Sequence, residues 1–317
     1  MTEREAARVE AARVEAARVE AARVEAARVE AARVEAARVE AVRVPTDDGW
    51  ILHGERRPNE GPVVVLGHAM MVDRRTLDRP RGAGLASVLH ARGLDVITFD
   101  ARGHGQSGPS ALEGASWTYD DIVRGDLPAM IRFARKIADG RRVAVLGHSL
   151  VGHAAMITAG LVPEHAPDRV VGYGPNLWAP HLERSARERL RKGLTVRAWL
   201  AYARLRGCFD APGLGLGSDA EAAAYVEEFV SMWARDRLAA RDGTDYEQAL
   251  SRVRIPVLAY SSTRDRKFAP PASVQAFVQP IPGVEHRRLE GGPDHMGFVL
   301  SPTSRPIWEE TAEWIAR

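Results

Sequence analysis

The stretch from 141 to 159 constrains the fold of this chain more than any other. Its apolar run, Val143-Ala144-Val145-Leu146, predicts a buried strand, and the small residues after Ser149 predict a helix. Ser149 therefore stands at a corner between a strand and a helix. A serine hydroxyl is a weak nucleophile unless a tight turn presents its oxygen to a base and to backbone N–H groups. Glycines beside the corner permit such a backbone.

This corner departs at one position from the G-x-S-x-G pattern of nucleophilic serines. Gly147 and Ser149 fit the pattern, but Val151 occupies the second glycine position and the next glycine is Gly152. A β-branched residue there needs a small neighbour on the adjoining strand, so we expect a change in packing more than in chemistry. The alternative is that Ser149 only caps the helix that begins at Leu150.

The N-terminal segment is a repeat. Residues 5–39 are seven copies of Glu-Ala-Ala-Arg-Val, and a degenerate copy covers 40–44. A step of five residues turns about 140° around a helix, so the valines form no apolar stripe. Each Glu precedes an Arg by three residues, which supports a solvated helix. We predict a charged, low-complexity helix without a catalytic role over 1–41, with a partner-binding helix as the alternative, and a globular domain over 42–317.

Composition disfavours several classes of protein. A net charge of +2 is too small to predict a nucleic-acid partner, and a single cysteine, Cys208, excludes an intrachain disulfide. No apolar run approaches the roughly 20 residues that span a bilayer, and no signal peptide is recognisable. The expected location is the cytoplasm. The ten histidines show no zinc-ligand spacing, so we expect neither a metal nor another cofactor.

Strands and helices alternate along the globular part after an initial hairpin over 42–55. This order implies an α/β fold with a mostly parallel sheet and helices on both faces. The predicted strands are 62–67, 94–99, 141–147, 169–174, 255–261 and 285–289, and the predicted helices include 76–92, 120–136, 272–278 and 306–316.

The alternation stops over about 175–252, which predicts a helical insertion that would serve as a lid. A helix is expected over 195–206, ending at Gly207. Ser218-Asp219-Ala220-Glu221 matches a capping box in front of a second helix. Eight basic residues against two acidic ones over 181–206 would suit an anionic substrate or a lipid surface; the alternative is an ordinary solvated face.

Several motifs together resemble the α/β-hydrolase family over about 42–317. They are His68-Ala69-Met70 after a strand, the turn at 100–107, and the corner at Ser149, followed by a late Asp265 and His295. The family's catalytic residues occur in the order Ser, acid, His along the chain. The resemblance implies an α/β-hydrolase fold with a helical lid and a triad of Ser149, Asp265 and His295.

The residues themselves suit these roles. His295 lies in a glycine-rich loop after the last predicted strand and would act as general base and then acid. Asp265, after the preceding strand, would orient the imidazole. No acidic residue closely follows the strand at 169–174, and Asp294 is too near His295 in sequence to be aimed at its ring. Asp100, Arg102 and Ser107 are expected to brace their own turn.

The resemblance also implies an oxyanion hole made of backbone N–H groups. The donors would be Leu150 and Met70, with Ala69 as the alternative to Met70. The lid is expected to supply an apolar acyl pocket, although its large side chains would also serve as the insertion's own core. The candidates for this pocket are Trp199, Leu200, Phe229 and Trp233.

The leading hypothesis is a serine hydrolase that cleaves a carboxylic ester, or else a thioester or amide, through an acyl-Ser149 intermediate. Its partner would be a small-molecule acyl substrate. Two alternatives remain open at this point: an acyltransferase or another acyl or carbon–carbon bond chemistry on the same triad, and a non-catalytic ligand-binding protein on the same fold.

Overall fold

The computed structural model describes Arg18, Glu20, Arg23 and residues 39–317. The charged helix predicted over 1–41 therefore lies almost wholly outside the described residues. Glu40–Arg317 form one compact unit. Its first strand, β1 (Glu40–Pro45), begins inside the degenerate copy of the repeat, two residues before the predicted domain start.

The unit is built on one eight-stranded sheet in the order β1-β2-β4-β3-β5-β6-β9-β10. β2 pairs antiparallel with β1 and β4, and all other neighbours are parallel. Every residue of β3, β4, β5 and β9 is buried, as expected for strands covered on both faces. The strands are β2 (Ile51–Arg57), β3 (Val63–Gly67), β4 (Asp95–Phe99), β5 (Val143–His148), β6 (Arg169–Tyr173), β9 (Val257–Ser262) and β10 (Glu285–Leu289).

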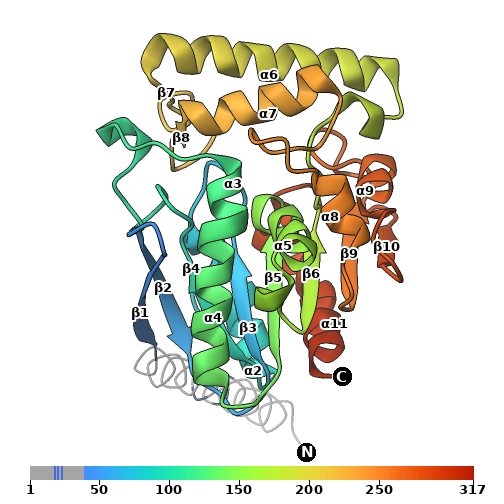
Figure 1. Cartoon of the computed structure of the whole chain (residues 1–317). Coiled ribbons are helices and arrows are strands. Elements are labelled where there is room, and N and C mark those ends of the chain that lie inside the picture. Colours follow the sequence, from blue (N-terminus) through green and yellow to red (C-terminus); the bar gives the residue numbers. More distant parts are fainter. Residues whose placement is uncertain (1–17, 19, 21–22, 24–38) are drawn as a thin grey trace, which may run out of the picture. The chain divides into compact units, whose positions relative to one another are not determined.

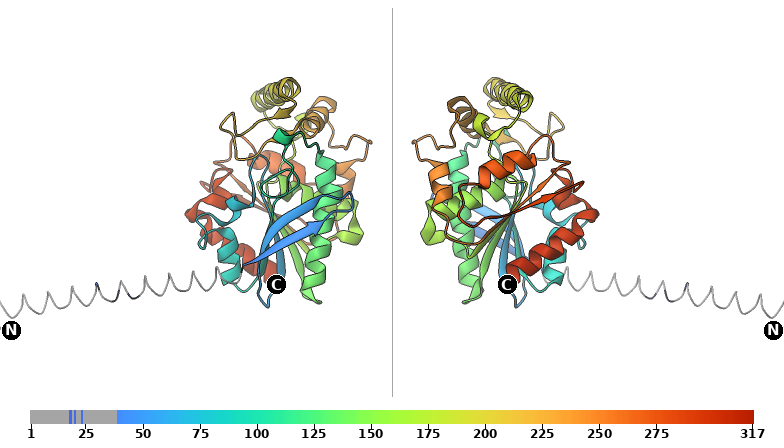
Figure 2. Two further views of the ribbon diagram at one scale, coloured as in Figure 1. Left: turned by 90° about the vertical axis from the view of Figure 1, so that its left-hand side faces the viewer. Right: turned by 90° about the vertical axis from the view of Figure 1, so that its right-hand side faces the viewer.

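Helices cover both faces of this sheet, so that α4 and α11 lie on opposite sides in Figure 2. Side chains alternate between the two cores: Val63 and Val65 enter one, Val64 and Leu66 the other. The first face holds α4 (Leu127–Ala138), α5 (Leu150–Leu161), α8 (Tyr246–Ser251) and α9 (Pro271–Val278). The second holds α2 (Leu85–Ala91), α10 (Gly297–Leu300) and α11 (Arg305–Ala316).

The α/β architecture predicted from the alternating pattern is confirmed, but two of the helices that cover the sheet differ from expectation. The helix expected over 76–92 is a short 3₁₀ turn, Arg74–Asp78, followed by a loop and then α2. Pro80 has no N–H to donate and Gly82 has a φ of 84°, so the 3₁₀ turn cannot continue as a helix into α2. The helix expected over 120–136 is present as α3 (Tyr119–Asp121) and α4, joined by a π-helical turn, Ile122–Asp126.

The insertion predicted as a lid contains α6 (Ala186–Arg206) and α7 (Ala223–Arg235), which lie side by side above one end of the sheet (Figure 1). α6 starts nine residues earlier than expected, where Ser185 accepts a hydrogen bond from the Glu188 N–H. Two short antiparallel strands, β7 (Cys208–Phe209) and β8 (Glu221–Ala222), connect the helices. The remaining short helices are Ala111–Glu113, Pro163–His165, Pro180–Leu182 and Pro302–Ser304.

The capping box predicted at Ser218 to Glu221 is wrong. α7 begins at Ala223 and has no side-chain cap. Ser218 instead bonds to Asp219, and Glu221 is the first residue of β8, with its side chain fully buried. No helix in the described part of the chain is long and apolar enough to span a bilayer.

Candidate active site

Ser149 occupies a strained corner between β5 and α5. Its φ of 48° and ψ of −104° lie outside the ordinary regions for a residue with a side chain. Its N–H donates to the Tyr173 carbonyl, 2.9 Å away, which ties the corner to β6. The Ser149 side chain makes no capping hydrogen bond to α5, so the hypothesis of a simple helix cap is wrong.

The small neighbour that Val151 requires is Gly67, at the end of β3. A Cβ on Gly67 would lie 2.2 Å from Val151 Cγ1, so the valine fills the space that a side chain on β3 would need. Gly147 is equally constrained, because a Cβ there would lie 2.1 Å from the Gly152 nitrogen. The missing glycine of the motif is thus compensated by a glycine on the neighbouring strand.

We expect Gly67→Ala to lower the free energy of unfolding by roughly 1–3 kcal/mol, because the added methyl overpacks against Val151. The double variant Gly67→Ala/Val151→Gly should recover most of this loss, since it removes the opposing side chain. Urea unfolding of the wild type, both single variants and the double variant measures the coupling. If Gly67→Ala lowered the free energy of unfolding equally in the wild type and in the Val151→Gly variant, this packing argument would be contradicted.

His295 and Asp265 are paired at the carboxyl ends of β9 and β10. His295 Nδ1 lies 2.5 Å from Asp265 Oδ2, and the other carboxylate oxygen accepts hydrogen bonds from the N–H groups of Phe268 and Ala269. Burial alone would raise the pKa of Asp265, but the hydrogen bonds and charge around it outweigh burial, so this pKa lies below its ordinary value. Asp265 is therefore an ionised acceptor for the His295 N–H.

Two neighbours hold the His295 ring. His148 Nε2 donates to the His295 carbonyl at 2.9 Å, and burial, with the nearby His295, lowers the pKa of His148 to about 3, so it stays neutral. Phe268 stacks on the His295 ring, with centroids 4.9 Å apart. No sequence motif predicts a role for either residue. The one available signal is their position, since His148 directly precedes Ser149 and Phe268 follows Asp265 by three residues.

The lid also contacts the Asp265 loop through a buried lysine on α6. Lys192 donates to Glu183 at 2.5 Å and to the Phe268 carbonyl at 3.2 Å. Burial lowers the pKa of Lys192, and the Glu183 charge opposes this effect. The solvated face considered as the alternative for the basic residues of the lid therefore does not include Lys192, because its side chain is buried.

Ser149 and His295 line one cavity of about 110 Å³ beneath the lid. Trp199 and Phe229 line it as predicted, together with Trp178, Phe268 and Leu216. Leu200 and Trp233 do not: Leu200 packs against the main core, and Trp233 packs with Trp178 and Val196. Of the described residues in the cavity wall, none is Asp, Glu, Lys or Arg. Two larger hollows of about 490 and 620 Å³ include neither Ser149 nor His295, although the second reaches Asp265. A third hollow, of about 400 Å³, shares Phe268, His295 and Met296 with the cavity.

Of the residues proposed for an oxyanion hole, Met70 and Ala69 line this cavity, and Leu150 directly follows Ser149, which also lines it. Within the described residues, the backbone N–H groups of Leu150 and Met70 donate to no acceptor, and neither does that of Ala69, the alternative. The next N–H after each predicted donor is occupied: that of Val151 lies 3.4 Å from the His68 carbonyl, and that of Met71 donates to Glu221.

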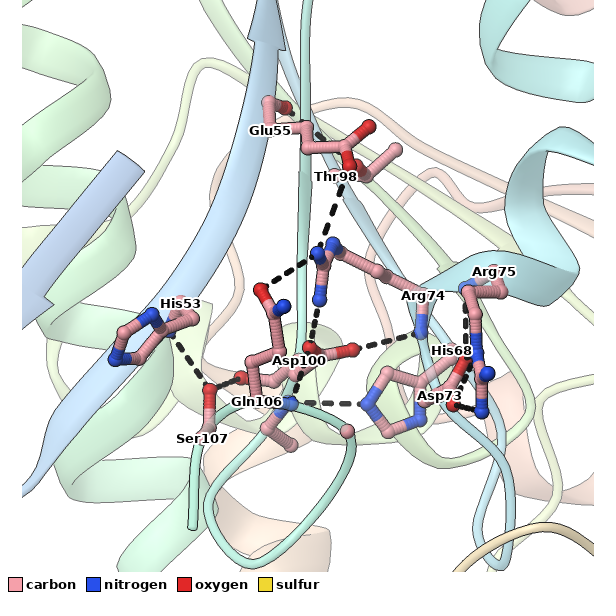
Figure 3. A network of polar contacts seen from close by, with 12 residues as sticks. His53, Glu55, His68, Asp73, Arg74, Arg75, Thr98, Asp100, Gln106 and Ser107 are labelled. Atoms are coloured by element: carbon pink, nitrogen blue, oxygen red, sulfur yellow. Dashed lines mark hydrogen bonds and ion pairs between the residues drawn. The ribbon is translucent and has the colours of Figure 1, made fainter. Parts of the chain in front are cut away.

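A polar network braces the loop that carries Met70 (Figure 3). His68 Nε2 accepts from the Ala101 N–H at 3.0 Å, so the proton is on Nδ1, which donates to the Ala69 carbonyl at 2.7 Å. Asp100 pairs with the Arg74 side chain and accepts from the Arg74 and Gln106 N–H groups.

The rest of the predicted turn is braced in the same way. Ser107 Oγ donates to the Asp100 carbonyl at 2.8 Å and accepts from the His53 N–H at 2.7 Å, as Figure 3 shows. Arg102 pairs with Asp126 and Asp48. Asp100, Arg102 and Ser107 therefore stabilise their own turn, as the sequence predicted, and none of them lines the cavity.

Comparisons with known proteins agree with this architecture. A family model described as "Serine aminopeptidase, S33" matches residues 79–290. Triacylglycerol lipase 2 of Arabidopsis thaliana is 32% identical over 142 residues, covering 38% of this chain and 34% of the lipase. Human lysosomal acid lipase/cholesteryl ester hydrolase is 29% identical over 139 residues, covering 39% and 35%. The match thus spans about a third of the length of these relatives.

Solved structures share the fold at low sequence identity. An esterase of Pyrococcus furiosus is 18% identical, with a TM-score of 0.57, over 87% of this chain and 88% of the esterase. A putative aryl esterase of Burkholderia cenocepacia is 17% identical, with a TM-score of 0.57, over 87% of this chain and 98% of that one.

Proposed function

The chain belongs to the serine aminopeptidase S33 family of α/β-hydrolases, and we propose that it is a serine hydrolase that cleaves a carboxylic ester through an acyl-Ser149 intermediate. The observation that carries the proposal is the shared cavity: Ser149, on its strained corner, faces the same space as the His295 ring that is bonded to Asp265. This is the arrangement of nucleophile, base and orienting acid that acyl transfer needs.

The catalytic steps follow from the proton positions. His295 Nδ1–H donates to the Asp265 carboxylate, which leaves Nε2 free to accept the Ser149 proton. The Ser149 oxygen attacks the ester carbonyl carbon, and the resulting oxyanion accepts from the N–H groups of Leu150 and Met70. His295 then protonates the departing alkoxide, and the acyl group stays on Ser149. A water molecule then attacks the acyl carbon while His295 takes its proton. The bond from this carbon to the Ser149 oxygen breaks, His295 returns the proton to that oxygen, and the acid leaves.

The cavity wall favours an ester over the free amino terminus of a peptide. An aminopeptidase must place the ammonium group of its substrate near the scissile bond, and an ammonium group without a carboxylate partner is costly to bury. The described residues of the wall offer no carboxylate, and much of the wall is formed by Trp178, Trp199, Phe229 and Phe268. These rings suit an uncharged acyl group.

The size of the cavity favours a short acyl chain. Its volume of about 110 Å³ is smaller than the roughly 150 Å³ of an apolar protein cavity that holds one benzene. Acyl groups of about two to four carbons would fit beside Ser149 without movement of the lid. Longer chains would have to displace Trp199 or Phe229, or pass His295 into the adjoining hollow.

We therefore expect kcat/KM for p-nitrophenyl esters to be highest for short acyl groups and to fall at least about tenfold by decanoate. Trp199→Ala should shift the preference toward longer chains, because it enlarges the cavity. Trp233→Ala is the matched control, since it removes a lid tryptophan that does not line the cavity. A flat response to chain length, or equal shifts in both variants, would contradict the assignment of the acyl pocket.

A further inference from the structure

The lid contacts the proposed oxyanion loop through Glu221, 150 positions after Met71 in the sequence. Glu221 Oε1 accepts a hydrogen bond from the Met71 N–H at 2.7 Å and lies 3.1 Å from His104 Nε2. The Glu221 and His104 side chains are both fully buried. A carboxylate from the insertion therefore bonds directly to the turn that carries Met70.

Glu221 and His104 form a charged pair. His104 Nδ1 lies 2.8 Å from the Arg102 carbonyl, so it donates there, and Nε2 donates to Glu221. Burial alone would lower the pKa of His104, but the charge and hydrogen bond of Glu221 raise it to about 9. A buried carboxylate opposite an imidazolium makes a stronger acceptor for the Met71 N–H than a neutral group would.

The lid holds the other side of Met71 as well. The Ser218 and Asp219 N–H groups both donate to the Met71 carbonyl, at 2.9 and 3.1 Å. A Cβ on Gly217 would lie 2.0 Å from that carbonyl oxygen, so the two segments approach as closely as glycine allows. The lid thus engages both the N–H and the carbonyl of Met71.

Met71 needs this support because its backbone is in the left-handed region, with a φ of 63°. A methionine adopts this conformation only where its surroundings fix it. The peptide plane between Met70 and Met71 contains the Met71 N–H, so the bond to Glu221 also fixes the direction in which the chain passes through Met70. Release of Met71 would let the Met70 N–H turn away from the cavity.

We propose that Glu221 is a positioning residue for the oxyanion hole: paired with His104, it fixes the Met70-Met71 turn so that the Met70 N–H points at the oxyanion. The proposal rests on the proposed function. It makes the lid segment from Gly217 to Glu221 a part of the catalytic structure. If the lid opened freely above the cavity, it would break the bonds to Met71, and the Met70 N–H would no longer be held as an oxyanion donor.

The test compares two ways of changing the pair, with p-nitrophenyl acetate as substrate. Glu221→Gln removes the charge but keeps an oxygen that accepts from the Met71 N–H. Glu221→Met/His104→Phe removes the acceptor and fills the site with apolar side chains, so that no charge is left buried without a partner. Glu227→Met, on the exposed side of α7, is the control and should stay within about threefold of wild type.

We expect the double variant to lose about 100-fold in kcat while KM changes by less than about threefold, because an oxyanion donor acts in the transition state. Glu221→Gln should retain at least about a tenth of the wild-type kcat, since its acceptor remains. A merely structural role would lower the thermal midpoint and the active fraction without this split between kcat and KM.

A folded double variant with kcat near that of wild type, or a Gln variant as impaired as the double, would overturn the proposal. If the double variant does not fold by circular dichroism, Glu221→Asp replaces it, because the shorter carboxylate keeps the charge but withdraws from Met71, and unchanged kcat there would also overturn the proposal. Wild type with no more activity than Ser149→Ala would instead refute the proposed ester hydrolysis itself.

Discussion

Replacement of Ser149 by alanine is expected to lower kcat for a p-nitrophenyl ester by roughly 10⁶-fold, because removal of the nucleophile leaves only binding and oxyanion stabilisation. Labelling by a fluorophosphonate, which phosphonylates an activated serine, should disappear in the same variant. The physical reason lies in the corner itself, where a φ of 48° presents the hydroxyl to the cavity and no helix N–H engages it. The measurement is initial rate together with in-gel fluorescence of the labelled protein.

The control for this prediction is Ser251→Ala, at the exposed end of α8, where the hydroxyl donates to the Gln248 carbonyl. This variant should hydrolyse ester and take up label like the wild type. Labelling that persists in Ser149→Ala would assign the nucleophile to another residue. A wild type that neither hydrolyses esters nor reacts with the probe would favour a ligand-binding protein on this fold.

The core of the fold follows from local sequence signals. Apolar runs such as 63–66 and 143–146 are too short for helices and too continuous for half-exposed strands, so they predict buried parallel strands, and the structure confirms this. The order of Ser149, Asp265 and His295 places all three after strands that end at one edge of the sheet. This is why their approach to one another is predictable without coordinates.

The errors arise where tertiary contacts override a local pattern. Ser218 to Glu221 has the spacing of a capping box. The Glu221 carboxylate instead bonds to the Met71 N–H and to His104, and these contacts stabilise it more than a helix end would. Leu200 follows Trp199 in α6, and a step of about 100° turns its side chain away from the cavity. His148 and Phe268 have no motif of their own, so only the folded chain shows their contacts with His295.

The second large effect is expected for Asp265→Asn, with a loss of about 10⁴-fold in kcat at neutral pH. The amide oxygen of the new side chain would keep the bonds from the Phe268 and Ala269 N–H groups, which leaves its NH₂ group facing His295 Nδ1. An N–H donor there requires Nδ1 to be an acceptor, so the ring proton moves to Nε2. Protonated Nε2 cannot take the Ser149 proton, and the nucleophile stays inactive.

Asp294→Asn is the matched control, because Asp294 adjoins His295 in sequence but its side chain accepts from the Gly297 N–H, at 2.8 Å, instead of facing the ring. Asp294→Asn should keep a near-wild-type kcat. If Asp294→Asn lost activity while Asp265→Asn kept it, Asp294 would be the residue that orients His295. The ¹⁵N shifts of the His295 ring report which nitrogen carries the proton in each variant.

The lowered pKa of Asp265 adds a stability effect: the stabilisation is present above the unfolded-state pKa of about 3.9 and is lost as pH falls through the lower folded value. Asp265→Asn should therefore show less acid destabilisation than wild type, even though it is nearly inactive.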